Sequence, residues 1–220
     1  MSDTTVLIVD DHPLFSKGLS FLINSQSSYA VIGEAQNRAE AMELLRNEKP
    51  SLAIVDLNLG NEEGLDLIKD MKSYNPDIVI LVLSMHDERY YAERVLRAGA
   101  KGYIMKHETG TKVIAAIKTV MSGKVYLSEA ERELLFEYMA GDTFKEGKDR
   151  LSSIQKLSDR QFQIFNLIGK GLGTVEIASK LNISPKTIDT HKEHIKLKLH
   201  CNSSQELRQF AVEWMGKLPV

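Results

Sequence analysis

The sequence is poor in cysteine and has no long apolar run. A single cysteine, Cys201, occurs in 220 residues, and one thiol supports neither a disulfide framework nor a zinc-thiolate site. No apolar stretch approaches the ~20 residues that a membrane-spanning helix needs. The apolar run Val6–Val9 is too short for a signal-peptide core and is followed by acidic residues rather than a small-residue cleavage site. We therefore expect a cytoplasmic protein with no membrane partner.

Charge is unevenly distributed along the chain. The formal net charge is only −2, and 43% hydrophobic with 26% charged residues is ordinary for a globular protein. From residue 151 onward there are 10 Lys and Arg against 6 Asp and Glu, a balance of +4. The preceding residues carry 18 against 24, a balance of −6. An acidic first part joined to a basic last part predicts different partners for the two parts.

Short apolar runs alternate with helical patterns through the first part of the chain. The runs are continuous rather than alternating, which is typical of strands buried on both faces of a parallel sheet; they are Val6–Val9, Ala30–Ile32, Leu52–Val55, Ile78–Leu83 and Tyr103–Met105. The amphipathic stretches between and after them are Leu14–Ile23, Ala39–Leu45, Leu65–Met71, Tyr90–Ala98 and Val113–Met121. Five strand–helix repeats predict an α/β fold with a five-stranded, doubly wound parallel sheet over residues 1–125.

The last part of the chain has no strand signal. A helical piece, Glu129–Met139, leads into the polar stretch Gly141–Arg150, so residues 126–152 are interpreted as a linker with a helical segment. Residues 153–220 carry four short helical patterns, which predicts an all-α second domain. We expect these helices to start at Ser158 with Gln161 in a capping box, at Thr174 as N-cap with Glu176 in the first turn, at Ser184 before Pro185, and at Ser203 or Ser204.

Polar residues follow the buried strands of the first domain. Asp10 and Asp11 follow the first strand, Asp56 the third, Ser84 the fourth and Lys106 the fifth. Ligands of open α/β sheets bind outside the carboxyl ends of the strands, where the strand order reverses. With the order 2-1-3-4-5, the first and third strands are neighbours, and these five side chains converge.

Three carboxylates in one pocket need compensating positive charge. Each pair of unit charges at ~4 Å repels by roughly 4 kcal/mol at an effective dielectric of ~20. Mg²⁺ prefers oxygen ligands and often binds together with a phosphate, and the Lys106 ammonium adds a compact positive charge. A carboxylate beside Mg²⁺ and an ammonium can accept a phosphoryl group, because that reaction depends mostly on positioning and charge neutralisation.

These segments resemble the receiver domain of two-component response regulators. The resemblance covers residues 1–125 and is carried by VLIVDDHPLF, LAIVDLNL, VLSMHDERY and GAKGYIMK. It implies that Asp56 is the phosphoacceptor, phosphorylated by a sensor histidine kinase. It also implies roles for further residues: Mg²⁺ ligation by Asp10, Asp11, Asp56 and the Asn58 main-chain carbonyl, a hydroxyl that moves toward the phosphoryl group at Ser84, an ion-pair partner at Lys106 and an aromatic switch at Tyr103. His107 follows Lys106 where many receivers have proline, so the cis peptide bond often found there is not expected.

A helix over residues 185–199 has one packing face and one polar face. At 100° per residue the packing face contains Ile188, His191, Lys192, Ile195 and Leu199. Lys186, Thr190 and Glu193 lie opposite, flanked by Asp189 and Lys196 on one shoulder and Lys198 on the other. A short helix with a polar outer face and flanking lysines suits insertion into the major groove of DNA.

This second domain resembles the LuxR-type helix-turn-helix of the NarL/FixJ response regulators. The matching positions are Gly171, Glu176-Ile177-Ala178, Leu181, Ile183-Ser184, Thr187-Ile188, His191 and Lys198-Leu199. The resemblance implies base readers at Asp189, Thr190 and Glu193, and further DNA contacts at Lys186, Thr187 and Lys198. Gln161 stands where the family commonly has Glu, and Asp189 where many members have lysine. Because carboxylates accept from cytosine N4 but cannot bond guanine O6 or N7, we expect a different operator from that of the lysine-bearing members.

The combined features predict a transcription factor rather than an enzyme. We expect phosphorylation of Asp56 to promote dimerisation and sequence-specific binding to double-stranded DNA, with RNA polymerase a further candidate partner. One alternative is a Mg²⁺-dependent phosphohydrolase that uses Asp56 as nucleophile. It is disfavoured because Asn58 stands where such hydrolases usually carry an acid or base. A second alternative, DNA binding with a vestigial receiver, is disfavoured by the complete set of pocket residues.

Overall fold

The computed structural model describes residues 4–59, 62–108, 110–133 and 153–216. The chain divides into two compact units, Met1–Phe136 and Glu137–Val220, and each is described by itself. The predicted linker Gly141–Arg150 lies outside the described residues, and the predicted helical piece Glu129–Met139 is described only as far as residue 133, where it is helical. Among the described residues, no helix combines the length and the apolar composition that crossing a membrane requires.

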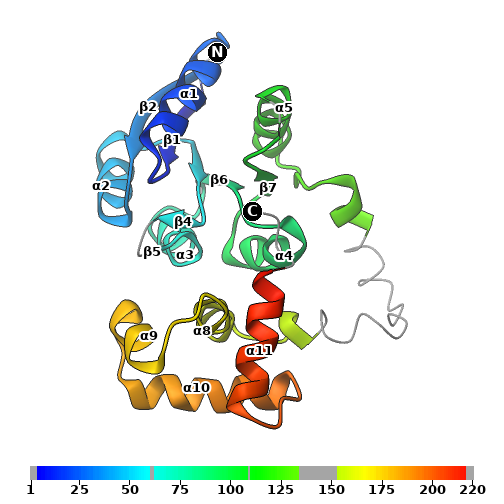
Figure 1. The fold of residues 1–220 in the computed structure, drawn as a ribbon. Helices are drawn as coiled ribbons and strands as arrows, with labels where there is room; N and C mark the ends of the chain where they lie inside the picture. Colours follow the sequence, from blue (N-terminus) through cyan, green and yellow to red (C-terminus); the bar gives the residue numbers. More distant parts are fainter. Residues whose placement is uncertain (1–3, 60–61, 109, 134–152, 217–220) are drawn as a thin grey trace. The chain divides into compact units, whose positions relative to one another are not determined.

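A five-stranded parallel sheet forms the middle layer of the first unit (Figure 1). Its strands are β1 (Thr4–Val9), β2 (Tyr29–Ala35), β3 (Leu52–Val55), β6 (Val79–Ser84) and β7 (Gly102–Met105). Their order, β2-β1-β3-β6-β7, is the order 2-1-3-4-5 on which the expected convergence of the strand-end residues was conditional. The central strand β3 is buried throughout, whereas the edge strand β2 is mostly half-exposed. Because most of β2 is partly exposed to solvent, the strand includes residues outside the apolar run Ala30–Ile32 that predicted it.

Helices cover both faces of this sheet (Figure 1). One face carries α1 (Pro13–Asn24) and α5 (Gly110–Met121), and the other carries α2 (Arg38–Glu48), α3 (Gly64–Tyr74) and α4 (Glu88–Ala98). Side chains of α1 and α5 pack on those of the strands to form a continuous core. The predicted α/β fold is confirmed. A two-stranded hairpin, β4 (Asn58–Leu59) with β5 (Glu62–Glu63), follows β3 and was not predicted.

The second unit is helical over its described residues, 153–216. Its main helices are α8 (Asp159–Gly169), α9 (Thr174–Leu181), α10 (Pro185–Lys198) and α11 (Ser204–Met215). Phe165 on α8 packs edge-on against Phe210 on α11, with 5.5 Å between ring centroids. Ile177 on α9 and Ile188 on α10 are fully buried. The predicted all-α second domain is therefore confirmed.

Three of the four predicted helix starts are confirmed. Ser158 and Gln161 form a capping box, and Ser184 accepts from the Thr187 amide ahead of α10. Ser203, rather than Ser204, caps α11. The start of α9 was predicted wrongly: Gly173 is the N-cap, and its amide donates to Glu176 Oε2 at 2.7 Å. The Thr174 hydroxyl instead bonds residues of α10.

The segment that follows α5 is packed against the start of α4. The Ser128 amide donates to Glu88 Oε1 at 2.9 Å, and Leu127 and Glu131 are buried. Glu131 Oε2 has no hydrogen-bond partner. Burial raises the pKa of Glu131 to about 7, and the neighbouring acids Glu88 and Asp87 add to this effect. The packed segment therefore contains a carboxyl group that resists ionisation.

We expect the packing of this segment to weaken as the pH rises. The pKa of Glu131 is raised from 4.5 to about 7, so its contribution to stability is complete below about pH 4.5 and is lost as the pH rises through about 7. Glu131→Gln should stabilise the full chain at pH 8 by about 1 kcal/mol, because the neutral amide avoids the ionisation of a buried carboxyl beside Glu88 and Asp87, and should change little at pH 5. Urea unfolding at both pH values measures this difference. Glu129→Gln, at an exposed position, is the matched control, and an equal gain from both substitutions at pH 8 would contradict the interpretation.

Candidate functional site

The site lies at the carboxyl ends of β1 and β3, which are adjacent in the sheet. Val9 pairs with Val55 in the parallel register, and the Asp56 amide donates to the Val9 carbonyl at 2.9 Å. This register places the residues that follow the two strands side by side. Asp10 and Asp56 are each 3% exposed. The two carboxylates therefore lie in a pocket largely shielded from solvent.

Lys106 joins these two carboxylates. Its Nζ atom lies 2.6 Å from Asp10 Oδ2 and 2.6 Å from Asp56 Oδ2. The backbone of Lys106 is held at the end of β7, where its amide donates to the Ser84 carbonyl at 2.8 Å. The Phe15 ring of α1 covers the ammonium, with its centroid 4.6 Å from Nζ. One buried cation thus compensates the negative charges that follow two separate strands.

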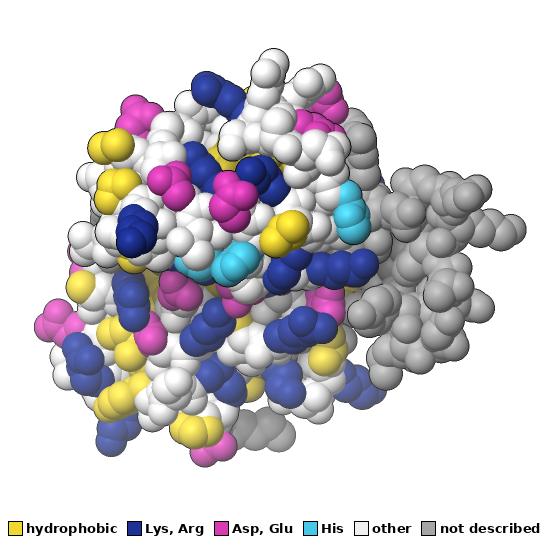
Figure 2. Space-filling model, turned by 90° about the horizontal axis from the view of Figure 1, so that it is seen from below, with side chains coloured by type: hydrophobic (Ala, Val, Ile, Leu, Met, Phe, Trp, Pro, Cys, Tyr) yellow, Lys and Arg dark blue, Asp and Glu magenta, His cyan; other side chains and the backbone are white. Residues whose placement is uncertain are grey.

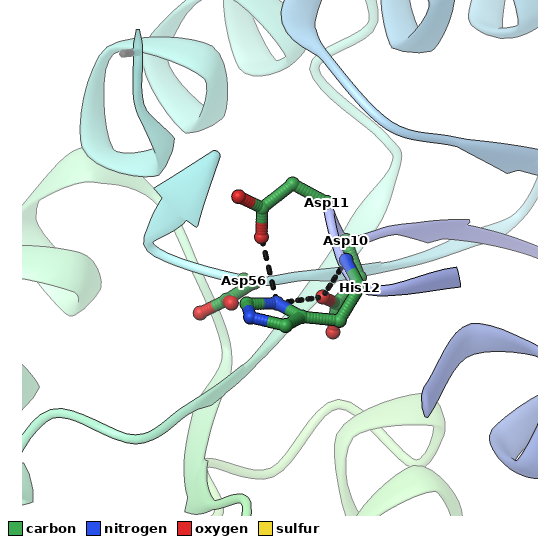
Figure 3. A group of neighbouring side chains, drawn as sticks. All are labelled: Asp10, Asp11, His12 and Asp56. Atoms are coloured by element: carbon green, nitrogen blue, oxygen red, sulfur yellow. Dashed lines mark hydrogen bonds and ion pairs between the residues drawn. The ribbon is translucent and has the colours of Figure 1, made fainter. Parts of the chain in front are cut away.

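His12 extends the pocket toward Asp11. Its Nδ1 atom lies 3.2 Å from Asp10 Oδ1 and 2.8 Å from Asp11 Oδ1 (Figure 3). The His12 amide also donates to Asp10 Oδ1 at 2.9 Å. The sequence analysis missed both His12 and Phe15. The position of His12, directly after an acidic pair, was a signal that could have identified it.

The donor set suits a hard divalent cation. Each of Asp10, Asp11, His12 and Asp56 offers one ligand atom, and these atoms all lie within 4.8 Å of one another. Asp11 Oδ1 is buried and makes no hydrogen bond of acceptable geometry, although it lies close to His12. Three carboxylates and one ammonium leave a formal charge of −2, which a divalent cation would balance. Asn58, the other predicted ligand, is the first residue of β4. Its backbone N–H donates to Asp56 Oδ1 at 3.3 Å.

Ser84 and Tyr103 meet around the backbone of His86. Ser84 ends β6 and is fully buried, and its Oγ atom accepts from the His86 amide at 3.4 Å. The Tyr103 hydroxyl donates to the His86 carbonyl at 2.6 Å, and burial raises the pKa of Tyr103 well above its usual range. The His86 ring stacks on Tyr91 of α4, with 4.7 Å between centroids. A short path therefore connects the Ser84 hydroxyl with both Tyr103 and α4. No described peptide bond is cis, including the one before His107.

The packing face predicted for α10 is confirmed. Ile188, Ile195 and Leu199 are buried, and His191 and Lys192 are half-buried at its edges. Five of the six residues predicted to contact DNA are exposed: Lys186, Thr187, Asp189, Thr190 and Glu193. Glu193 pairs with Lys196 at 2.9 Å, and the Thr190 hydroxyl donates to the Lys186 carbonyl at 3.1 Å. The exposed face of α10 thus combines charges of both signs.

Lys198 differs from the other predicted DNA contacts because its ammonium has partners within the second unit. Nζ donates to Gln161 Oε1 at 2.8 Å and to the Lys156 carbonyl at 2.9 Å. Gln161 is buried in the capping box of α8. These contacts join the end of α10 to the start of α8, so Lys198 has a structural role whether or not it contacts DNA.

Charged side chains of both signs are exposed on the described part of the second unit, for example at Lys186, Asp189 and Glu193. Figure 2 shows Lys and Arg side chains as well as Asp and Glu side chains on the face that it draws. A mixed surface attracts the phosphate backbone less strongly than a uniformly basic one, because each neutralised phosphate adds a separate increment of affinity. The contacts made by individual side chains therefore matter more here than net charge.

The chain matches two family models. Residues 6–118 match the response regulator receiver domain, and residues 155–211 match the bacterial regulatory proteins of the luxR family. Among curated proteins, the oxygen regulatory protein NreC of Staphylococcus carnosus (strain TM300) is 34% identical over 209 residues, covering 94% of this chain and 96% of NreC. NreC of Staphylococcus epidermidis is 34% identical over 210 residues, with the same coverage.

Solved structures resemble all or part of the chain. RcsB from Salmonella enterica serovar Typhimurium, bound to promoter rprA in the presence of the phosphomimetic BeF3−, gives a TM-score of 0.72 at 25% identity, covering 96% of this chain and 99% of RcsB. A LuxR-family two-component response regulator from Aurantimonas sp. SI85-9A1 gives a TM-score of 0.59 at 28% identity, covering 63% of this chain and 99% of that protein.

Proposed function

The chain belongs to the NarL/FixJ-type response regulators, with a receiver domain and a LuxR-type DNA-binding domain, and from that premise we propose that phosphorylation of Asp56 controls its binding to DNA. The observation that carries this proposal is the buried Asp56 carboxylate, paired with Lys106 beside Asp10 and Asp11. The proposed domains are the receiver over residues 1–125, a linker over 126–152 and the DNA-binding domain over 153–220. The proposed site of action is the cytoplasm.

The proposed reaction is phosphoryl transfer from a histidine of a sensor kinase. An oxygen of Asp56 forms a bond to phosphorus while the P–N bond breaks, and the departing imidazole nitrogen keeps the electron pair and takes up a proton. The product is an acyl phosphate on Asp56. Asp10, Asp11, Asp56 and the Asn58 carbonyl would hold Mg²⁺, which supplies charge neutralisation for the phosphoryl oxygens. Lys106 already contacts Asp56 and is placed to pair with the added phosphoryl oxygens.

The contacts of Ser84 suggest how phosphorylation is transmitted. A phosphoryl group on Asp56 offers strong acceptor oxygens, and the proposed response is that the Ser84 hydroxyl donates to one of them. This movement would remove the Ser84 contact with the His86 amide. Because Tyr103 is bonded to the His86 carbonyl, a shift of His86 alters the buried position of Tyr103 and the stacking on α4.

The proposed output is dimerisation and binding to double-stranded DNA. RcsB, the structural relative, is seen bound to promoter DNA with a phosphomimetic, and as dimers on DNA. The surface proposed to contact DNA comprises Lys186, Thr187, Asp189, Thr190, Glu193 and Lys198. Lys198 would exchange its contact with Gln161 for a DNA phosphate. RNA polymerase is a proposed further partner, because the chain is a transcription regulator of this family.

The first expected result is Mg²⁺-dependent labelling of Asp56. Incubation with acetyl phosphate should add one phosphoryl mass to the full chain, because Asp56 is the one proposed phosphoacceptor and lies beside Lys106 and the proposed Mg²⁺ ligands. Intact-mass spectrometry should show no addition in Asp56→Asn, or in wild type with EDTA. Asp66→Asn, which changes an exposed acid on α3, should be labelled normally. Full labelling of Asp56→Asn would exclude the assignment.

The second expected result concerns the lifetime of the acyl phosphate. The proposed receiver assists only its own phosphorylation and dephosphorylation, and Asn58 and His86 lie two residues after Asp56 and Ser84. Replacing both by alanine should change the dephosphorylation rate several-fold, because these side chains flank the approach of water. The affinity of the unphosphorylated protein for DNA should stay the same. An unchanged half-life of the phosphorylated double variant would show that His86 serves only to stack on Tyr91.

The third expected result links phosphorylation to the reading helix. Two readers held together gain effective concentration and can raise affinity by ~10² or more. Beryllofluoride should shift the full chain to a dimer in sedimentation and tighten its binding to an inverted-repeat site. Glu193→Ala should relax base preference at one position by about 1–3 kcal/mol, whereas Lys186→Ala should weaken all sequences alike and flatten the salt dependence. A beryllofluoride-treated protein that stays monomeric on and off DNA would contradict this mechanism.

A further inference from the structure

Lys192 is connected to a proposed base reader through a residue of the preceding helix. Its ammonium donates to the Thr174 hydroxyl, with 2.5 Å between Nζ and Oγ1. The same hydroxyl donates its proton to Asp189 Oδ1 at 3.3 Å. Lys192 and Asp189 are three residues apart on α10 and so lie on the same side of it. Thr174, the first residue of α9, thus bridges two side chains of the reading helix.

The surroundings of Lys192 hold its ammonium near this bridge. The side chain lines a cavity of about 450 Å³ whose other walls include Ile168, Leu172, Leu207 and Arg208. Burial lowers the pKa of Lys192, the Asp189 carboxylate raises it, and Arg208 lowers it. The apolar side chains of this lining suit the methylene stem of Lys192 and disfavour an unpaired ammonium. The ammonium is paired instead with the Thr174 hydroxyl, and the Asp189 carboxylate supplies a favourable charge nearby.

We propose that Lys192 is a positioning residue that determines base preference at the DNA position read by Asp189. This inference rests on the proposed function, since it assumes that α10 reads DNA. A carboxylate entering the major groove is repelled by the phosphates and can rotate among several rotamers. The Thr174 bridge holds Oδ1 of Asp189, while the Lys192 charge offsets the repulsion. Oδ2 is not used in this bridge and can accept from a base donor such as cytosine N4.

Base preference, measured separately from overall affinity, tests this inference. The full chain with beryllofluoride is used to select DNA from a randomised pool, and the position whose preference disappears in Asp189→Ala identifies the base that Asp189 reads. At that position Lys192→Met and Thr174→Val should each reduce discrimination roughly three- to tenfold, the range expected for loss of one hydrogen bond. Thr174→Ser keeps the hydroxyl and should retain the preference. Lys170→Met, which removes an exposed lysine after α8, is the charge-matched control.

Two further measurements separate positioning from other roles. In the Asp189→Ala background, Lys192→Met should cause no additional loss of discrimination, because its effect passes through Asp189. Thermal unfolding of each variant identifies losses that come from misfolding, and Thr174→Val tests the bridge without changing charge. If Lys192→Met weakens all sequences alike and lowers the salt dependence by about one charge, Lys192 is a phosphate contact and the inference is overturned.

Unchanged discrimination in both folded variants would also overturn the inference while leaving the proposed function intact. A wild-type protein that selects no sequence at all, with or without beryllofluoride, would overturn the proposed function together with it. The two failures are distinguishable. If only the inference fails, wild type still selects a DNA sequence and Glu193→Ala still changes that selection.

Discussion

The architecture of the acidic pocket in the first unit depends on one ammonium group shared by two buried carboxylates. Lys106 at the end of β7 contacts Asp10 after β1 and Asp56 after β3. Two buried carboxylates without a cation would repel each other strongly, and breaking a buried pair by removing one partner is costly. The lysine therefore stabilises the convergence of three strand ends. It also leaves a pocket whose remaining negative charge attracts a divalent cation.

Close backbone packing keeps Asp56 in this position. The Gly64 amide, at the start of α3, donates to the Leu57 carbonyl at 3.0 Å. A Cβ atom on Gly64 would lie 2.3 Å from the Asp56 carbonyl oxygen, so no larger residue fits there without displacing the backbone. The Asp56 backbone is thus held close to the start of α3, and its side chain is held by Lys106.

Lysines of the second unit also donate hydrogen bonds within the fold, but to neutral groups. Lys198 is bonded to Gln161 of the α8 capping box, and Lys192 is bonded through Thr174 to Asp189. Lys198, which the sequence analysis placed among the DNA contacts, and Lys192, which it placed on the packing face, thus both contribute to contacts between the helices. The exposed face of α10 therefore carries charges of both signs, at Lys186, Asp189 and Glu193.

The sequence by itself determined the five strand–helix repeats of the first unit, the helix caps at Ser158 and Ser184, and the positions of the polar residues that follow the strands. These features follow from local periodicity, from short-range capping and from the common direction of parallel strands. Only the tertiary structure decided that His12 and Phe15 complete the pocket, that Glu131 is buried, and that Thr174 bonds α10 instead of capping α9. Each of these contacts depends on how whole elements pack or how the chain turns. Hydrophobic periodicity along the sequence carries no information about the distances between side chains that are brought together in this way.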